Sequence, residues 1–205
     1  MLTDGHGRVH RDLRVSLTDR CNLRCTYCMP AEGMPWLPTP DLLTTDELLR
    51  VIEVAVAAGI TEVRLTGGEP LLRPDVVDVV RGVAAMSGEH GPVEVSLTSN
   101  ALRLPKLAQP LADAGLARVN ISLDTLRADR FASMTRRDRF EDTMAGIAAA
   151  DAAGLAPSRS TPCSCAASTT TRPATCCGGP STTATTCASS SRCRSTAVTR
   201  GSARR

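Results

Sequence analysis

The stretch LRVSLTDRCNLRCTYCMP, residues 13–30, determines the fold class. It opens with a strand-like run (LRVSL, 13–17) that leads directly into a cysteine-rich loop. Comparable runs recur along the chain, each followed by a helix-like segment. This β-then-α repetition predicts a parallel sheet with right-handed crossovers, either doubly wound or closed into a barrel. The later strand-like runs are EVRLT (62–66), VEVSL (93–97) and RVNISL (118–123).

Four helical segments lie between and after these strands. Thr44 or Thr45 is an N-cap for the first, with Asp46 and Glu47 in its opening turn. Gly59 ends that helix. The other three are predicted over residues 75–86, 106–114 and 143–153.

Polar residues follow each strand and are expected to meet at one rim of the sheet. The three-cysteine loop follows the first strand, Gly67–Glu69 the second, Thr98–Asn100 the third, and Ser122 ends the fourth. No Gly-x-Gly-x-x-Gly follows a strand, which disfavours a dinucleotide-binding domain. The site is therefore predicted at the carboxyl ends of the strands.

Cys21, Cys25 and Cys28 have the spacing C-x3-C-x2-C. A structural zinc site needs four ligands, and residues 1–157 hold no fourth cysteine. A disulfide would leave one odd thiol, and simple packing is the remaining alternative. Three thiolates suit a [4Fe–4S] cluster with one iron left open.

Charge is divided unevenly over the 205 residues. The net charge is +3, but residues 158–205 hold 7 of the 24 basic residues and none of the 21 acidic ones. Residues 1–157 are therefore acidic, and the net charge gives no support for nucleic-acid binding. No apolar run reaches the ~18 residues of a membrane helix, and the charged N-terminus lacks a signal-peptide core. A cytoplasmic protein is expected.

Composition changes abruptly after Pro157. Residues 158–205 contain 10 Ser, 11 Thr and 6 Cys, with Val198 as the one large aliphatic residue. We expect this tail to be disordered, because it cannot bury enough apolar surface. Three interpretations compete: a natural low-complexity tail, a cysteine-rich metal or disulfide module, and a frameshift. The last is favoured, because SRSTPCSCAASTT in GC-rich codons reads VKVNAVLLRGVND one base earlier, a strand-like pattern.

TDRCNLRCTYCMP (18–30) followed by LTGGEP (65–70) resembles the radical S-adenosylmethionine (SAM) enzymes. Over about residues 8–157 the chain is similar to the GTP 3′,8-cyclase family, which begins molybdenum-cofactor biosynthesis. The similar segments include EVRLTGGEPLLRPD, SLTSNALRL, LADAGLARVNISLDTL and FASMTRRDRFEDTMAGIAAADAAGLAP.

This resemblance implies an α/β fold, a partial TIM-like (β/α) barrel of the radical SAM type. The core would span residues 1–157, incomplete here, and 158–205 would be an out-of-frame disordered tail. The implied reaction uses a SAM-derived 5′-deoxyadenosyl radical to convert GTP to 3′,8-cyclo-7,8-dihydro-GTP. The implied site residues are Cys21, Cys25 and Cys28 for the [4Fe–4S] cluster, Tyr27, Gly68 and Ser122 for SAM, and Arg14, Arg64 and Thr98 for GTP.

The family pattern also implies a flavodoxin or ferredoxin as electron donor, and cyclic pyranopterin monophosphate synthase as the next step. Arg159 stands where the family has a GTP-contacting lysine. The family's second three-cysteine cluster, its later SAM-contacting methionine and its C-terminal Gly-Gly are missing. We therefore expect this chain to be inactive. Arg136, Arg137 and Arg139 are interpreted as a solvated loop cluster.

Two other functions remain open. A different radical SAM enzyme, for example one acting on peptides, would share the cysteines and the GGEP motif but need not share Arg14, Arg64 and Thr98. An iron- or zinc-binding module with a basic tail would bind metal without cleaving SAM.

Overall fold

The computed structural model describes residues 2–155 and 159–160. The chain divides into two units, 1–167 and 168–205. The predicted disordered, out-of-frame tail of 158–205 lies outside the described residues, apart from the backbone of Arg159 and Ser160.

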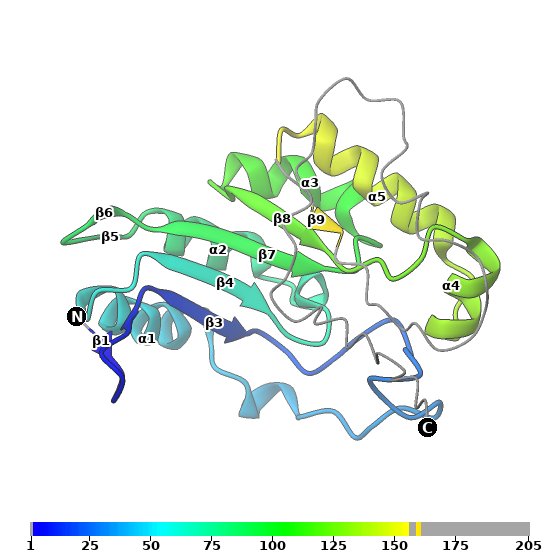
Figure 1. The fold of residues 1–205 in the computed structure, drawn as a ribbon, viewed down its shortest axis with the longest axis horizontal. Helices are drawn as coiled ribbons and strands as arrows, with labels where there is room; N and C mark the ends of the chain where they lie inside the picture. The colour runs from blue at the N-terminus through cyan, green and yellow to red at the C-terminus, as the bar shows by residue number, and fades with distance from the viewer. Residues whose placement is uncertain (1, 156–158, 161–205) are drawn as a thin grey trace, which may run out of the picture. The chain divides into compact units, whose positions relative to one another are not determined.

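The main sheet has five parallel strands in the order β3-β4-β7-β8-β9 (Figure 1). This order follows the sequence without a reversal, whereas a doubly wound sheet needs a point where the order reverses. The described sheet is therefore of the barrel kind, as an open arc. The strands are β3 (Asp12–Ser16), β4 (Glu62–Thr66), β7 (Glu94–Ser99), β8 (Arg118–Ile121) and β9 (Arg159–Ser160). The four strands expected in residues 13–123 are confirmed to within two residues at each end.

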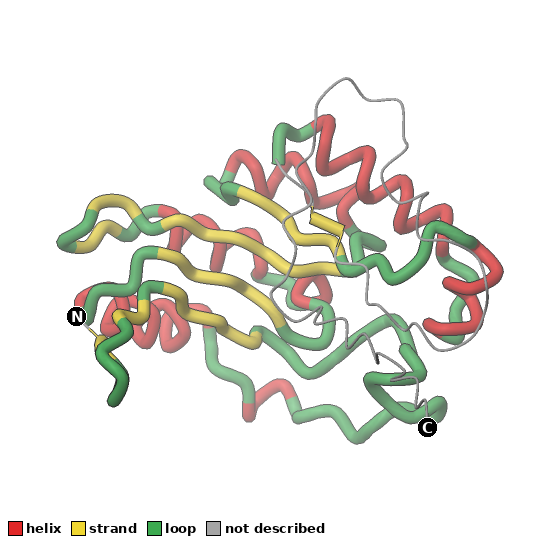
Figure 2. The backbone as a smooth tube through the Cα atoms, in the orientation of Figure 1, coloured by secondary structure: helices red, strands yellow, loops and turns green. Residues whose placement is uncertain are grey.

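Helices follow the strands, with α1 and α2 behind the sheet in the view of Figures 1 and 2. The predicted cap is present: the Thr44 side chain accepts a hydrogen bond from the Glu47 backbone, and the Glu47 side chain accepts one from Thr44. Helix α4 was not predicted from the sequence, and its buried residues are only Phe131 and Thr135. The helices are α1 (Thr45–Ala57), α2 (Val76–Ala84), α3 (Leu104–Asp113), α4 (Ala128–Thr135) and α5 (Phe140–Ala152), with 3-10 turns at Thr39–Asp41 and Pro70–Leu72. Two small hairpins pair β1 (Leu2–Thr3) with β2 (Val9–His10), and β5 (Ser87–Gly88) with β6 (Gly91–Pro92).

The sheet buries one face against the helices. Side chains alternate between the two faces of a strand, and the helix-facing set is apolar and almost fully buried. Burial of this face is the main source of stability for the described residues. Its central members are Val63, Leu65, Val95, Leu97, Val119 and Ile121. No helix among the described residues is long and apolar enough to cross a membrane.

Helix α5 packs unusually closely against the loop that follows β7. A Cβ added to Gly146 would lie 2.1 Å from the carbonyl oxygen of Ala101. The backbone of Ala101 cannot easily withdraw, because it is buried and has a φ of 70°. Gly146 therefore sets the distance between α5 and the site loop.

Gly146→Ala should lower the free energy of unfolding by about 2–3 kcal/mol, because the new methyl group overlaps buried backbone. Gly82→Ala is the matched control: its Cβ would meet only the tip of Leu49, which can rotate away. Urea unfolding followed by circular dichroism checks both variants. Equal stability of the two would contradict the packing argument.

Candidate functional site

A pocket of about 190 Å³ opens at the carboxyl ends of β4, β7 and β8. Seven of the nine predicted site residues line it, so the site expected at this rim is assembled from loops far apart in sequence. They are Cys21, Cys25, Cys28, Tyr27, Gly68, Thr98 and Ser122.

Cys21, Cys25 and Cys28 form no disulfide among the described residues and differ in exposure. Cys21 and Cys25 are half-buried and Cys28 is exposed. Burial raises the pKa of the Cys21 and Cys25 thiols. In the part of the chain that the structure describes, no three metal-binding side chains meet at the spacing of a single-ion site.

The residues present fit an iron–sulfur cluster. The three cysteines line one pocket, and a cluster of several irons can bridge thiols that one ion could not. The backbone N–H of Leu23 donates to Sγ of Cys21 at 3.5 Å, a hydrogen bond of the kind that tunes cluster sulfurs.

Gly67 and Gly68 hold the cysteine loop against β4. The backbone N–H of Gly68 donates to the Thr18 carbonyl at 2.7 Å, and that of Glu69 to Arg20 at 2.7 Å. A Cβ on either glycine would lie 2.4 Å from a carbonyl oxygen of residues 18–20. The family resemblance implied that Gly68 contacts SAM. The close approach in the structure is to the start of the cysteine loop.

Glu69 is the most deeply buried ionisable residue of the site, with only 1% of its surface exposed. Its carboxylate accepts hydrogen bonds from Leu71 N at 3.1 Å, Ser99 Oγ at 2.8 Å and Asn100 N at 2.8 Å. Burial nevertheless raises the pKa of this carboxyl. Glu69 thus joins the loop after β4 to the loop after β7.

Tyr27 and Asp124 connect opposite sides of the pocket. The Tyr27 hydroxyl donates to Oδ2 of Asp124 at 2.5 Å, although 59% of the tyrosine remains exposed. Partial burial of the hydroxyl and this hydrogen bond raise the pKa of Tyr27 above its usual range.

Ser122 is exposed, and its backbone N–H donates to the Ser99 carbonyl at 2.9 Å.

The sheet face opposite the core carries polar side chains. They form rows across the strands, because the strand register places residues of neighbouring strands side by side. Three rows run across it, from the amino to the carboxyl ends of the strands. The first is acidic (Asp12, Glu62, Glu94), the second basic (Arg14, Arg64, Arg118, with Ser96), and the third neutral (Ser16, Thr66, Thr98, Asn120).

The three arginines of the basic row are not equivalent. Arg118 forms ion pairs with Glu62, at 3.0 Å, and with Glu94. Arg14 and Arg64 lie opposite each other on β3 and β4 and form no ion pair within the described residues. Arg64 is half-buried, with a buried Nε that has no hydrogen-bond partner there. Two positive charges are thus left for an anion one row below Thr98.

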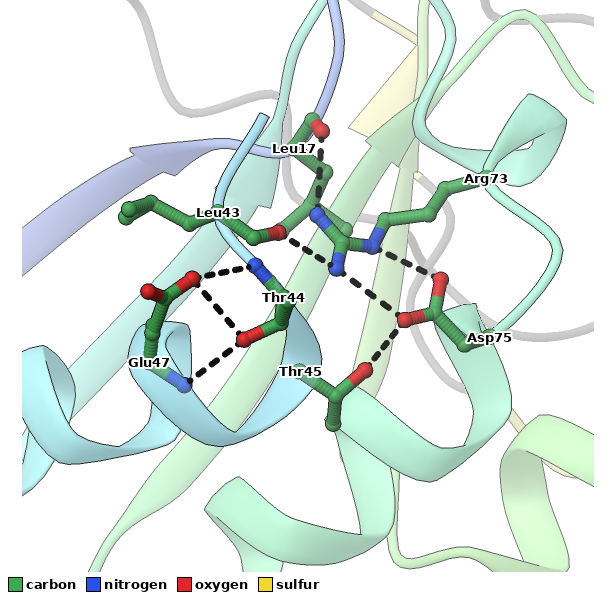
Figure 3. Close-up of polar contacts among 7 residues, drawn as sticks. All are labelled: Leu17, Leu43, Thr44, Thr45, Glu47, Arg73 and Asp75. Atoms are coloured by element: carbon green, nitrogen blue, oxygen red, sulfur yellow. Dashed lines mark hydrogen bonds and ion pairs between the residues drawn. The ribbon is translucent and has the colours of Figure 1, made fainter. Parts of the chain in front are cut away.

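Arg73 binds three separate segments of the chain (Figure 3). Its side chain is 10% exposed and forms a two-pronged ion pair with Asp75, at 2.8 and 3.0 Å. It also donates to the carbonyls of Leu43, at 3.0 Å, and Leu17, at 3.4 Å. The end of β3, the segment before α1 and the start of α2 are thereby joined.

The carboxyl end of α4 contacts the cysteine loop. Backbone N–H groups of Arg24 and Thr26 donate to the carbonyls of Thr135 and Met134 at 3.0 and 2.8 Å. Arg136, in the left-handed region at φ 53°, donates to the Met29 carbonyl at 3.2 Å. Arg136, Arg137 and Arg139 are exposed, as expected for a solvated loop cluster, and the Arg136 guanidinium also reaches back to the loop. Its TRRD context gave no sign of this long-range contact.

A parallel barrel-type sheet with a three-cysteine loop at its carboxyl rim is the arrangement typical of radical SAM enzymes. The model of the Radical SAM superfamily matches residues 15–163, and the chain belongs to this family. Among curated relatives, it is 60% identical over 158 residues to a GTP 3′,8-cyclase of Streptomyces coelicolor, and 57% over 159 residues to one of Corynebacterium glutamicum. These alignments cover 77% of this chain but only 46% and 42% of the relatives. The chain spans less than half the length of the relatives it matches.

Solved structures agree on the fold. HydG, a maturase of the [FeFe]-hydrogenase, aligns with a TM-score of 0.57 at 17% identity, over 70% of this chain and 33% of its own. Streptococcus suis SuiB bound to S-adenosylmethionine aligns at 0.56 and 18%, over 71% and 30%. The partial (β/α) barrel of the radical SAM type is confirmed.

Proposed function

We propose that the intact protein is a GTP 3′,8-cyclase and that residues 1–157 are the amino-terminal part of its radical SAM core. The 60% identity over 158 residues to the Streptomyces coelicolor relative carries this proposal. Residues 158–205 are proposed to be out of frame, which would leave this chain without the rest of the catalytic apparatus. The protein is proposed to work in the cytoplasm, with a flavodoxin- or ferredoxin-type electron donor. The cyclic pyranopterin monophosphate synthase step would consume its product.

Cys21, Cys25 and Cys28 would hold a [4Fe–4S] cluster. When bound, the cluster supplies an electron for the reductive cleavage of SAM. Tyr27, Gly68 and Ser122 line the same pocket and would bind SAM beside the cysteines. The hydrogen bond from Tyr27 to Asp124 would fix the tyrosine ring at the pocket mouth.

Arg14, Arg64 and Thr98 would bind GTP. Both arginines lack ion-pair partners in the described chain, and a triphosphate matches guanidinium groups well. Thr98 lies one row nearer the cysteines, so a nucleotide anchored on the arginines would extend toward the SAM pocket.

Anaerobic reconstitution of the 205-residue chain with iron and sulfide tests the proposal. We expect about four irons per chain, an electron paramagnetic resonance signal that SAM perturbs, and no conversion of GTP. Cys25→Ser should lose nearly all of the bound iron, whereas Cys176→Ser, in the tail, should retain it. Iron binding that is unaffected by Cys25→Ser would contradict the cluster assignment. Cyclised GTP from this chain would contradict the proposed inactivity.

GTP binding distinguishes the cyclase from other radical SAM enzymes. GTP should protect residues 1–157 from limited proteolysis, and Arg64→Gln should remove that protection. Arg81→Gln, on the exposed side of α2, is the control. Equal digestion with and without GTP would favour a different radical SAM activity.

A further inference from the structure

We infer that Arg24, between the first two cysteines, positions the cluster loop and sets the reduction potential of the cluster through its fixed positive charge. This inference rests on the proposed function, because it requires a cluster on Cys21, Cys25 and Cys28. It adds a residue that contacts no substrate and lies outside the predicted site set.

The Arg24 guanidinium is held from three sides. Its Nη1 donates to the carbonyls of Cys21 and Leu23, both at 2.8 Å. Its central carbon lies 5.3 Å from the ring centroid of Trp36, within the range of a cation–π contact. Gly33 lies close on a further side, since a Cβ there would be 3.4 Å from Nε. The guanidinium therefore has a defined position against the backbone of a cluster ligand.

No carboxylate neutralises this charge. Among the described residues, Arg24 forms no ion pair. Its side chain contacts the carbonyls of Cys21 and Leu23 and the ring of Trp36. The positive charge of Arg24 is instead held against the carbonyl of the cluster ligand Cys21, at 2.8 Å from Nη1.

A fixed cation beside a cluster ligand stabilises whichever oxidation state carries more negative charge. Reduction moves one electron from the donor onto the cluster, so the reduced state gains the most from Arg24. The half-buried setting limits screening by solvent and salt. Removal of the charge should make the cluster harder to reduce, while the cysteine ligands stay the same.

The test is a redox titration of the reconstituted 205-residue chain, followed by electron paramagnetic resonance. Arg24→Gln should lower the reduced-to-oxidised ratio at a fixed potential about tenfold, or about 59 mV for a one-electron couple. Arg24→Lys keeps the charge and should stay near the wild-type potential. Trp36→Leu keeps Arg24 and should shift the potential less than Arg24→Gln. Arg50→Gln removes one exposed charge from α1 and is the control.

Each outcome has a separate meaning. A wild-type chain that binds no cysteine-dependent cluster would overturn the proposed function, and this inference with it. A normal cluster content with an unchanged potential in Arg24→Gln would overturn the inference alone. Equal shifts in Arg24→Gln and Arg24→Lys would also overturn it, because the effect would then come from the loop geometry and not from charge.

Discussion

Glu69→Ala should lower the free energy of unfolding by about 3–5 kcal/mol, because it leaves three buried hydrogen-bond donors without an acceptor. The substitution leaves the backbone N–H groups of Leu71 and Asn100 and the Ser99 hydroxyl without their acceptor. Glu69→Gln should cost less, because its amide oxygen can still accept. Urea unfolding followed by circular dichroism measures the differences. Glu53→Ala, on the exposed face of α1, should leave stability unchanged.

The Glu69 carboxyl also predicts a pH dependence. Its pKa is raised by burial above the ordinary value of 4.5. The folded state therefore holds this proton more tightly than the unfolded state, and the stability gained from it is complete below pH 4.5. That contribution is lost as pH rises through the folded pKa. Relative to Glu69→Gln, the wild-type chain should become less stable above pH 4.5, and a rise would contradict the sign.

Gly68→Ala should lower the free energy of unfolding by about 3 kcal/mol and loosen the cysteine loop. Its Cβ would lie 2.4 Å from the carbonyl oxygens of both Asp19 and Arg20. Relief of that overlap would break the hydrogen bonds from Gly68 N to Thr18 and from Glu69 N to Arg20. Unfolding by urea gives the loss of stability, and limited proteolysis between residues 18 and 30 reports the loop.

Gly5→Ala is the control for this effect, since no atom lies within 4 Å of its added Cβ. It should match the wild-type chain in both measurements. A Gly68→Ala chain with wild-type stability and protection would show that the loop can retreat from β4 at little cost.

Much of the fold follows from local pattern. The alternation in EVRLT and VEVSL and the Thr44–Glu47 cap predicted β4, most of β7 and the start of α1, because these features act within a few residues. Helix α4 was missed, because its short segment ADRFASMT buries only two residues and has no capping hydrogen bond from a side chain. Its position comes from tertiary contact.

For the site too, some features could be predicted from the local sequence and others depend on tertiary contacts. The cysteine spacing and the GGEP motif predicted that the site lies at the carboxyl rim of the sheet. They did not distinguish Arg118, which is ion-paired, from Arg14 and Arg64, which are not. The order of the strands decides that difference. Arg118 on β8 reaches Glu94 on the adjacent β7 and Glu62 on β4 beyond it, and no local sequence pattern predicts that pairing. The contact from Arg136 to Met29 spans 107 residues and was equally invisible.

The acidic row of Asp12, Glu62 and Glu94 fixes a depth on the polar face of the sheet. A phosphate chain that enters from the carboxyl rim would meet attraction at Arg14 and Arg64. One row further in it would meet Asp12 and the ion pairs of Glu62 and Glu94 with Arg118, which offer no free positive charge. The proposed nucleotide would therefore stop at the level of the two arginines, and its depth would be limited by residues that it never touches.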